Sequence, residues 1–163
     1  MEVIEKYEVG TKTMLLVEEY HLDYNTIIHD VDGVYCTKQT VKSILNEACL
    51  ERASTYDGRI QAARTVTPYM KKTPLMICLI EKIYAFPTIG PTNYGCVWPF
   101  PENILGVQEE GNGRLRVEFI NGTSTSIKCS LHTFNTQKER AICSMNQFST
   151  NLFRQLKERI LFI

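Results

Sequence analysis

The chain has 163 residues, 44% of them hydrophobic and 22% charged, which is the composition of one ordinary globular domain. Equal numbers of basic and acidic side chains, 18 of each, exclude a uniformly basic or acidic protein. No apolar run approaches the roughly 20 residues of a membrane-spanning helix. The acidic N-terminus does not match a secretory signal, so we expect a cytoplasmic protein without membrane contact.

Acidic and basic residues are concentrated in different segments of the chain. The first 35 residues carry a net charge of −6, whereas residues 36–82 carry +4 and residues 130–163 carry +3. Two cationic segments and one anionic segment predict a polarised surface. Ordinary solvated helix faces are the alternative interpretation.

Short strands are predicted before residue 38. Apolar and polar residues alternate irregularly there, and Met14–Val17 and Asn25–Ile28 are predicted to be short strands. Between the second run and Val34–Cys36 lies Asp32-Gly33, a pair typical of two-residue hairpin turns. We therefore expect an antiparallel hairpin at this point.

A helix, a polar break and a second helix are predicted between Thr37 and Pro74. The first helix has apolar residues at helical spacing, namely Val41, Ile44, Leu45, Ala48 and Cys49. The break is Ser54–Arg59, where Gly58 can adopt a positive φ. The second helix runs from about Arg59 to Val66 and ends before Pro68, because a residue that precedes proline avoids the α region.

The middle of the chain predicts a buried hairpin followed by an irregular segment. Leu75–Ile80 and Ile83–Phe86 are continuous apolar runs, typical of strands buried on both faces. Recurrent proline and glycine make regular structure unlikely in residues 87–101. Its aromatic residues Tyr94 and Trp98 either pack on the core, which we favour, or face a partner.

The last part of the chain predicts a sheet and then helices. Three strand-like runs, Ile104–Glu109, Arg114–Ile120 and Thr123–Cys129, are joined by glycine turns and predict an antiparallel meander. From Ser130 the apolar period becomes helical, which predicts one long helix or two helices with a cap at Ser149 or Thr150. The whole chain, residues 1–163, is thus expected to form a single α+β domain with an antiparallel sheet, a basic helix pair and C-terminal helices.

No pattern of catalytic or metal-binding residues is recognisable. The sequence lacks the nucleophile-elbow, P-loop and dinucleotide-binding motifs. His29 and Asp30 are neighbours on a strand, so they are expected to point to opposite faces. The six cysteines include no C-x-x-C pair and predict buried free thiols. We therefore expect no enzymatic activity, no metal and no cofactor.

An ordered set of short motifs runs through most of the chain. The motifs are Tyr7–Val9, Ser54–Arg59, Lys72–Met76, Ile83–Thr88, Cys96–Trp98, Phe119–Gly122, Thr133–Gln137 and Arg140-Ala141. No single motif is diagnostic, but the ordered set is fairly specific. In order and approximate spacing, over about residues 5–148, the sequence resembles the ComK family of bacterial competence transcription factors.

The resemblance implies an activator of DNA-uptake genes that acts at the nucleoid. Family members bind paired A/T-rich boxes of double-stranded DNA as a homodimer or higher oligomer, mainly through the minor groove. They are also degraded through a protease adaptor. Longer members carry a C-terminal extension used in that control, whereas this sequence stops at Leu161-Phe162-Ile163, as a short paralogue would.

The cationic segment fits this expectation, because the narrow minor groove of A-tracts attracts inserted arginine or lysine. The residues expected to bind DNA are Arg52, Arg59, Arg64, Lys71, Lys72 and Lys42. Arg59 is the first choice for insertion, and a capping or ion-pair role with Asp57 is an equal alternative. Lys138 and Arg140 form a second basic patch, for which plain helix solubility is favoured.

A different function remains open on the same fold. The chain would then be a protein-interaction or regulatory module with weak or no DNA binding. Its anchor would be the Tyr94–Trp98 loop, since aromatic residues dominate interface hot spots.

Overall fold

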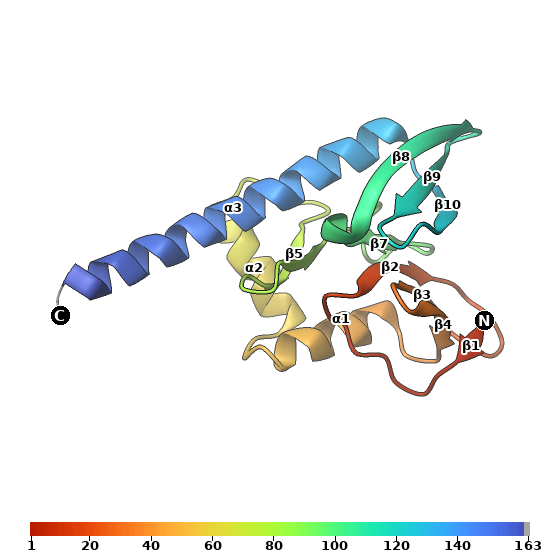
Figure 1. Cartoon of the computed structure of the whole chain (residues 1–163), viewed down its shortest axis with the longest axis horizontal. Helices are drawn as coiled ribbons and strands as arrows, with labels where there is room; N and C mark the ends of the chain where they lie inside the picture. The colour runs from red at the N-terminus through yellow and green to blue at the C-terminus, as the bar shows by residue number, and fades with distance from the viewer. Residues whose placement is uncertain (162–163) are drawn as a thin grey trace.

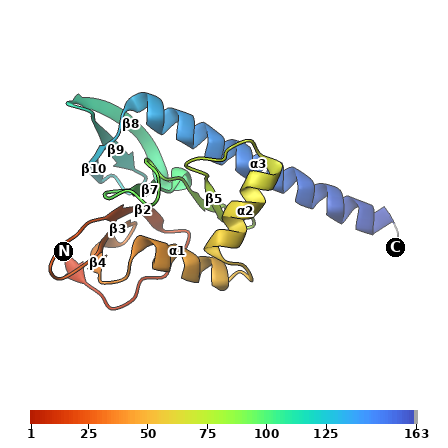
Figure 2. The same ribbon diagram turned by 180° about the vertical axis from the view of Figure 1, so that it is seen from behind.

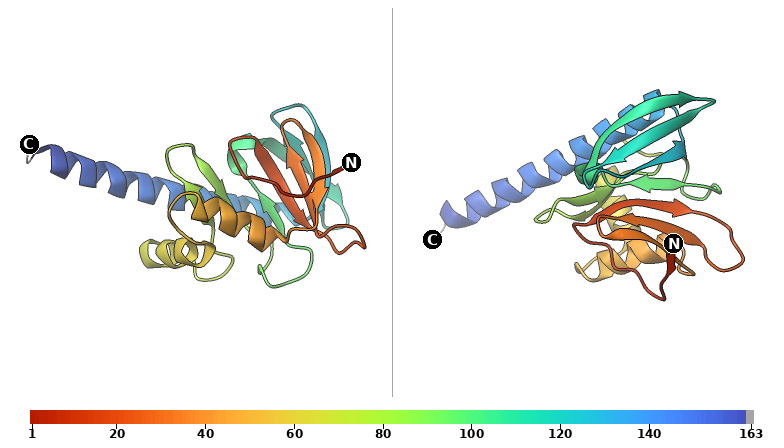
Figure 3. Two further views of the ribbon diagram at one scale, coloured as in Figure 1. Left: turned by 90° about the horizontal axis from the view of Figure 1, so that it is seen from below. Right: turned by 45° about the vertical axis from the view of Figure 1, so that its right-hand side comes forward.

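The computed structural model describes residues 1–161, and Phe162 and Ile163 at the end of the chain lie outside the described part. The fold is α+β, as predicted. A five-stranded sheet, a three-stranded sheet and a two-stranded hairpin are combined with three α-helices in the described residues (Figure 1). The two larger sheets form separate layers (Figure 3).

The N-terminal sheet has the strand order β1-β4-β3-β2-β7. Its strands are β1 (Glu2–Val3), β2 (Thr13–Glu18), β3 (Thr26–Asp30), β4 (Gly33–Thr37) and β7 (Val97–Pro99). The predicted strands and the β3–β4 hairpin are confirmed, but the turn lies one residue earlier than predicted. Asp30 pairs with Gly33, which leaves Val31 and Asp32 as the turn. The Asp30 carboxylate accepts the Asp32 N–H at 2.9 Å and closes it.

Strand β7 corrects the expectation that residues 87–101 lack regular structure. It pairs with β2, and on its other side the carbonyls of Val97 and Pro99 accept N–H groups from Thr88 and Phe86 at 3.0 and 3.3 Å. The N and C=O of one strand residue point to the same side. Pro99 has no backbone N–H, and the position where this N–H would be points toward Phe86 and Thr88 and not toward β2. No hydrogen bond between β2 and β7 is therefore lost, and proline is tolerated here.

Helix α1 (Val41–Leu50) buries the five apolar residues predicted for it, whereas α2 (Tyr56–Val66) begins earlier than expected. The Thr55 hydroxyl accepts the Gly58 N–H at 2.9 Å, so Gly58 lies in the first turn of α2 rather than in a break with positive φ. Ala53 adopts the positive φ instead, at 58°. The end of α2 before Pro68 is as predicted.

The remaining strands confirm the predicted hairpin and meander, except that the first hairpin strand ends at Cys78 and not at Ile80, which is 89% exposed. The hairpin consists of β5 (Leu75–Cys78) and β6 (Ile83–Ala85), and the meander of β8 (Ile104–Gly111), β9 (Arg114–Phe119) and β10 (Ser124–Lys128). A 3-10 turn, η1 (Pro101–Asn103), precedes β8.

The C-terminal segment is one continuous helix, α3 (Leu131–Leu161), so Ser149 and Thr150 lie inside it and begin no second helix. The Ser130 hydroxyl accepts the Thr133 N–H at 3.1 Å at its start. Only its first half contributes buried residues, and its second half extends away from the rest of the molecule (Figures 1 and 2).

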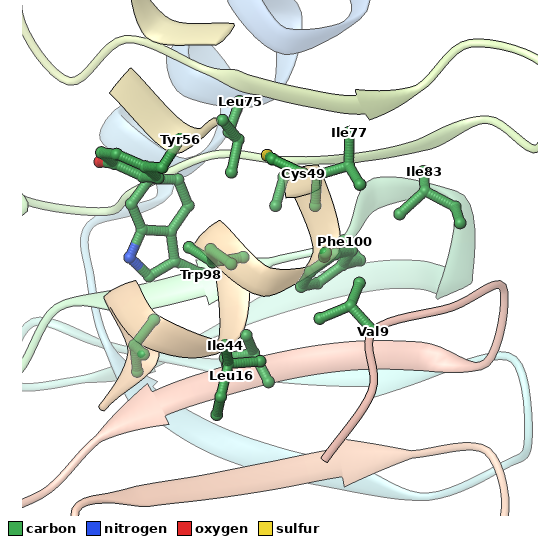
Figure 4. Packing of buried hydrophobic residues seen from close by; sticks show 14 of the residues in the cluster. Val9, Leu16, Ile44, Cys49, Tyr56, Leu75, Ile77, Ile83, Trp98 and Phe100 are labelled. Carbon is green, nitrogen blue, oxygen red and sulfur yellow. The ribbon is translucent and has the colours of Figure 1, made fainter. Parts of the chain in front are cut away.

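The β5–β6 hairpin separates two buried clusters. Leu75 and Ile77 face the cluster formed with α1, α2 and the five-stranded sheet, which Figure 4 shows from close by. Met76, Tyr84 and Phe86 face the cluster formed with the meander and α3. The alternation of strand side chains thus explains why the hairpin sequence is apolar throughout, as predicted for a strand pair buried on both faces.

We predict that Ala53→Gly stabilises the protein by about 0.5–1 kcal/mol, because a left-handed conformation penalises alanine but not glycine. Urea unfolding measures this change. Ala62→Gly, within α2, is the control and should destabilise by about 1 kcal/mol. Equal destabilisation by both substitutions would contradict the assigned backbone of residue 53.

Candidate nucleic-acid interface

Arg52 lies between α1 and α2, Arg59 lies in the first part of α2, and both have local partners. The Arg52 side chain is only 18% exposed, and its Nη1 donates to the Ala48 carbonyl at 2.9 Å. Its guanidinium also lies within 3.7 Å of the Glu51 carboxylate and 3.4 Å of the Glu81 carboxylate. Arg59 Nη2 donates to the Arg52 carbonyl at 3.3 Å, just beyond the end of α1.

These contacts favour a structural role for both arginines. Each Nε–H is buried and has no hydrogen-bond partner within residues 1–161. A guanidinium in this position stabilises carbonyls at the end of α1. For Arg59, the structure therefore favours the capping role over insertion into a DNA groove. The group that Arg59 contacts is the Arg52 carbonyl and not the Asp57 carboxylate.

Four of the predicted cations are more accessible. Lys42, Arg64 and Lys71 are exposed and Lys72 is half-buried. Arg64 Nε donates to the Thr73 hydroxyl at 3.1 Å, which fixes α2 to the loop that carries both lysines. Lys42 lies 4.0 Å from the Asp57 carboxylate and 5.4 Å from the centre of the Tyr56 ring, a weak pairing at an exposed position.

Gln137 of α3 brings one residue of the second basic patch next to this loop. Its side-chain amide donates to the Lys72 carbonyl at 2.7 Å and accepts from Arg140 Nη1 at 3.1 Å. Arg140 also lies 5.3 Å from the centre of the Tyr69 ring. Lys138 is two residues from Arg140 on the helix, so the two do not share a face. The predicted patch is therefore divided.

We define the basic surface as Lys42, Arg64, Lys71, Lys72 and Arg140. It joins three segments that are far apart in the sequence. Gln137, which makes this connection, was not identified from the sequence. One signal in the sequence could have identified it: a glutamine at a position that shares the buried apolar stripe of the helix with Phe134 and Ala141. In the structure, Gln137 is only 2% exposed.

The aromatic loop is divided between core and surface. Trp98 is 3% exposed and packs edge-to-face against Tyr56, so the expected packing holds for it. Tyr94 is 58% exposed and stacks on Tyr20 with 4.5 Å between ring centres. An anchor for a partner would therefore consist of the two tyrosines and not of Trp98.

Within residues 1–161, the titratable groups considered for catalysis contact separate neighbours. The His29 ring lies 5.6 Å from the Phe119 ring, tilted by 31°, and burial lowers the pKa of His29. The Asp30 carboxylate instead accepts a hydrogen bond from the Tyr7 hydroxyl at 2.6 Å. Burial raises the pKa of the Tyr7 hydroxyl and raises that of the Cys96 thiol to about 11, so neither ionises near neutrality. The histidine and aspartate thus serve different neighbours.

All six cysteines are free. Cys36, Cys49, Cys96 and Cys129 are buried, as predicted, whereas Cys78 is half-buried and Cys143 is exposed. Within residues 1–161 no group of three or more histidine, cysteine, aspartate or glutamate side chains is placed to hold a metal ion. In the same range, no helix is both long and apolar enough to cross a bilayer.

Comparison with known proteins identifies the family of this chain. The model of the ComK protein family matches residues 4–152. The chain belongs to the ComK family. A relative of this ComK-family chain, named "Competence transcription factor", comes from Bacillus subtilis (strain 168). The two are 25% identical over 157 residues, which are 96% of this chain and 82% of the relative. No solved structure matches.

We predict that Arg59→Ala in this ComK-family chain destabilises the fold by about 1–2 kcal/mol, because a charged hydrogen bond at the end of α1 is lost. Urea unfolding measures the loss. Lys71→Ala, at an exposed position of the same cationic segment, should change stability by less than about 0.5 kcal/mol. A similar small effect of both would contradict the capping role.

We also predict that His29 makes folding less favourable in acid. Burial lowers its folded-state pKa below the ordinary value of 6.5, so the unfolded chain binds the proton more readily. Stability is then full above that value and falls as the pH drops below it. His29→Phe should lose less stability than the natural chain between about pH 8 and about pH 5.5 in urea unfolding. Identical losses would contradict the burial of this imidazole.

Proposed function

We propose that this chain is a competence transcription factor that binds double-stranded DNA at the nucleoid. The observation that carries the proposal is the family match over residues 4–152, together with the function that the name of the relative states. The basic surface is the part of the molecule that we assign to the DNA contact.

The charges of the basic surface suit phosphate binding. Arg64, Lys71 and Lys72 form no ion pair with any carboxylate in residues 1–161, in contrast to Arg52. Unpaired cations at accessible positions attract the phosphate backbone and release its counterions. We assign Lys42, Lys71, Lys72 and Arg140 to phosphates, and we assign to Arg52 and Arg59 the support of the helix pair.

We further propose that recognition concerns paired A/T-rich boxes and uses the minor groove. A narrow A/T minor groove has an enhanced negative potential and needs few directional hydrogen bonds. Arg64 is the guanidinium best suited to enter it. Its Nε is anchored on Thr73 at 3.1 Å, and both Nη groups remain without a partner within residues 1–161.

The exposed half of α3 fits a role in self-association. Phe153, Leu156 and Ile160 follow one another at helical spacing, and Phe153 is 70% exposed. Apolar residues repeated three and four positions apart form the seam of paired helices. We propose that this seam joins two or more copies of the chain. A protease adaptor is a second proposed partner of the protein.

The alternative function is a protein-interaction or regulatory module with weak or no DNA binding. It is favoured by one observation, the exposed aromatic group formed by Tyr20 and Tyr94 near Leu22, which is 99% exposed. Such residues anchor protein interfaces. A module of this kind would leave A-tract duplexes unbound at every salt concentration.

We predict that the full chain shifts a duplex with paired A-tracts more strongly than a G·C-rich duplex. The affinity should fall linearly in log[salt] with a slope of about −0.9 per phosphate contacted. Lys71→Gln should weaken binding to both duplexes and reduce the slope by about 1. The control is Lys6→Gln, which removes an exposed cation outside the basic surface. Equal loss in both variants, or no shift at any salt, would refute the assignment.

We predict that Leu156→Glu lowers the oligomeric state, because a carboxylate in an apolar seam has no partner there. Analytical ultracentrifugation of the full chain measures this. Gln155→Glu adds the same charge at the neighbouring exposed position and should leave the mass unchanged. Unchanged mass in both variants would exclude α3 as the contact between copies.

A further inference from the structure

A cavity of about 320 Å³ lies between α1, α2, the end of β2 and the turn at Pro91-Thr92. This volume is in the range of small-molecule sites. Its apolar wall is formed by Val41, Leu45, Ile60 and Trp98, and its polar groups come from Glu18, Lys42, Tyr56, Asp57 and Arg64. The function proposed above uses some of its cations but not the cavity itself.

The aromatic part of the wall presents two unused hydrogen-bonding groups. The Tyr56 and Trp98 rings meet edge to face, with centres 6.2 Å apart. Figure 4 shows the phenol oxygen and the indole nitrogen on the same side of this cluster. Neither group has a hydrogen-bond partner within residues 1–161, and neither polar atom is among the fully buried ones, so both are open to a molecule in the cavity. A bound molecule would supply these partners.

The charges around the cavity indicate what kind of molecule this is. In the chain without DNA, Lys42 and Asp57 lie 4.0 Å apart at an exposed edge of the cavity and partly offset each other. Arg64 and Glu18 remain, and neither forms an ion pair within residues 1–161. Arg64 uses its Nε for Thr73, which leaves the two Nη groups for an anion. Glu18 is half-buried and offers a carboxylate for a cation.

We propose that this cavity binds a small zwitterion with an apolar body, of the class of hydrophobic amino acids. Its carboxylate pairs with Arg64 and its ammonium group with Glu18. Its apolar body packs on Trp98, Ile60 and Leu45. A molecule with a single charge would leave one of the two protein charges uncompensated, which disfavours its binding.

Trp98 is the only tryptophan of the chain, so its fluorescence reports on the cavity directly. The experiment titrates the full chain, without DNA, with three matched probes: homophenylalanine, 4-phenylbutyrate, which lacks its amine, and 3-phenylpropylamine, which lacks its carboxylate. Homophenylalanine carries both charges, and the other two carry one each. It should change the emission saturably and bind at least about tenfold more tightly than either analogue.

Three variants test the assigned contacts. Arg64→Gln and Glu18→Gln should each weaken homophenylalanine binding about tenfold, and Arg116→Gln, an exposed arginine that does not line the cavity, should not. Thr92→Phe should block the cavity at its exposed turn, and thermal unfolding should confirm that every variant is folded. Absence of saturable binding, equal binding of the three probes, or full affinity in Arg64→Gln would overturn the proposal. Because no DNA is present, these outcomes are independent of the proposed transcriptional role.

Discussion

The burial of the β5–β6 hairpin on both faces is the constraint on which the rest of the structure depends. Leu75 and Ile77 belong to one cluster and Met76 and Phe86 to the other, so a single strand pair connects the α1–α2 side with the meander and α3. Because a protein interior is close-packed, the position of one element fixes the positions of the elements that pack on it. The hairpin thus determines where the loop before it, with Lys71 and Lys72, meets α3.

Within that framework, hydrogen bonds decide which arginines are available for ligands. Arg59 is bound to a backbone carbonyl between two helices, and Arg52 is surrounded by two carboxylates. Arg64 and Arg140 are each oriented by one neutral side chain, Thr73 and Gln137 respectively. The four residues have the same chemistry, but a guanidinium oriented by a neutral group keeps its charge for an anion. The same reasoning links the basic surface and the cavity, since Arg64 belongs to both.

Most of the fold was predictable because local patterns encode it. The apolar stripe of α1, the apolar runs of β5 and β6 and the glycine turns of the meander each specify an element without distant partners. The predictions differed from the structure where two local signals competed. Gly58 suggested a break, but the cap from Thr55 starts α2 before it. The prolines around β7 suggested a loop, but the missing donor of Pro99 faces away from β2.

The sequence by itself determined the class of fold, the free thiols, the cationic segment and the resemblance to ComK proteins, because these depend on composition and on order along the chain. Only the tertiary structure decided which cations are accessible. It placed Arg52 and Arg59 against carbonyls and carboxylates. It also brought Gln137, which accepts a hydrogen bond from Arg140, to the Lys72 carbonyl, 65 residues earlier in the chain. It also formed a cavity between the elements that contain Glu18, Arg64 and Trp98. Such contacts depend on packing between distant segments, and nothing in the local sequence around each residue encodes them.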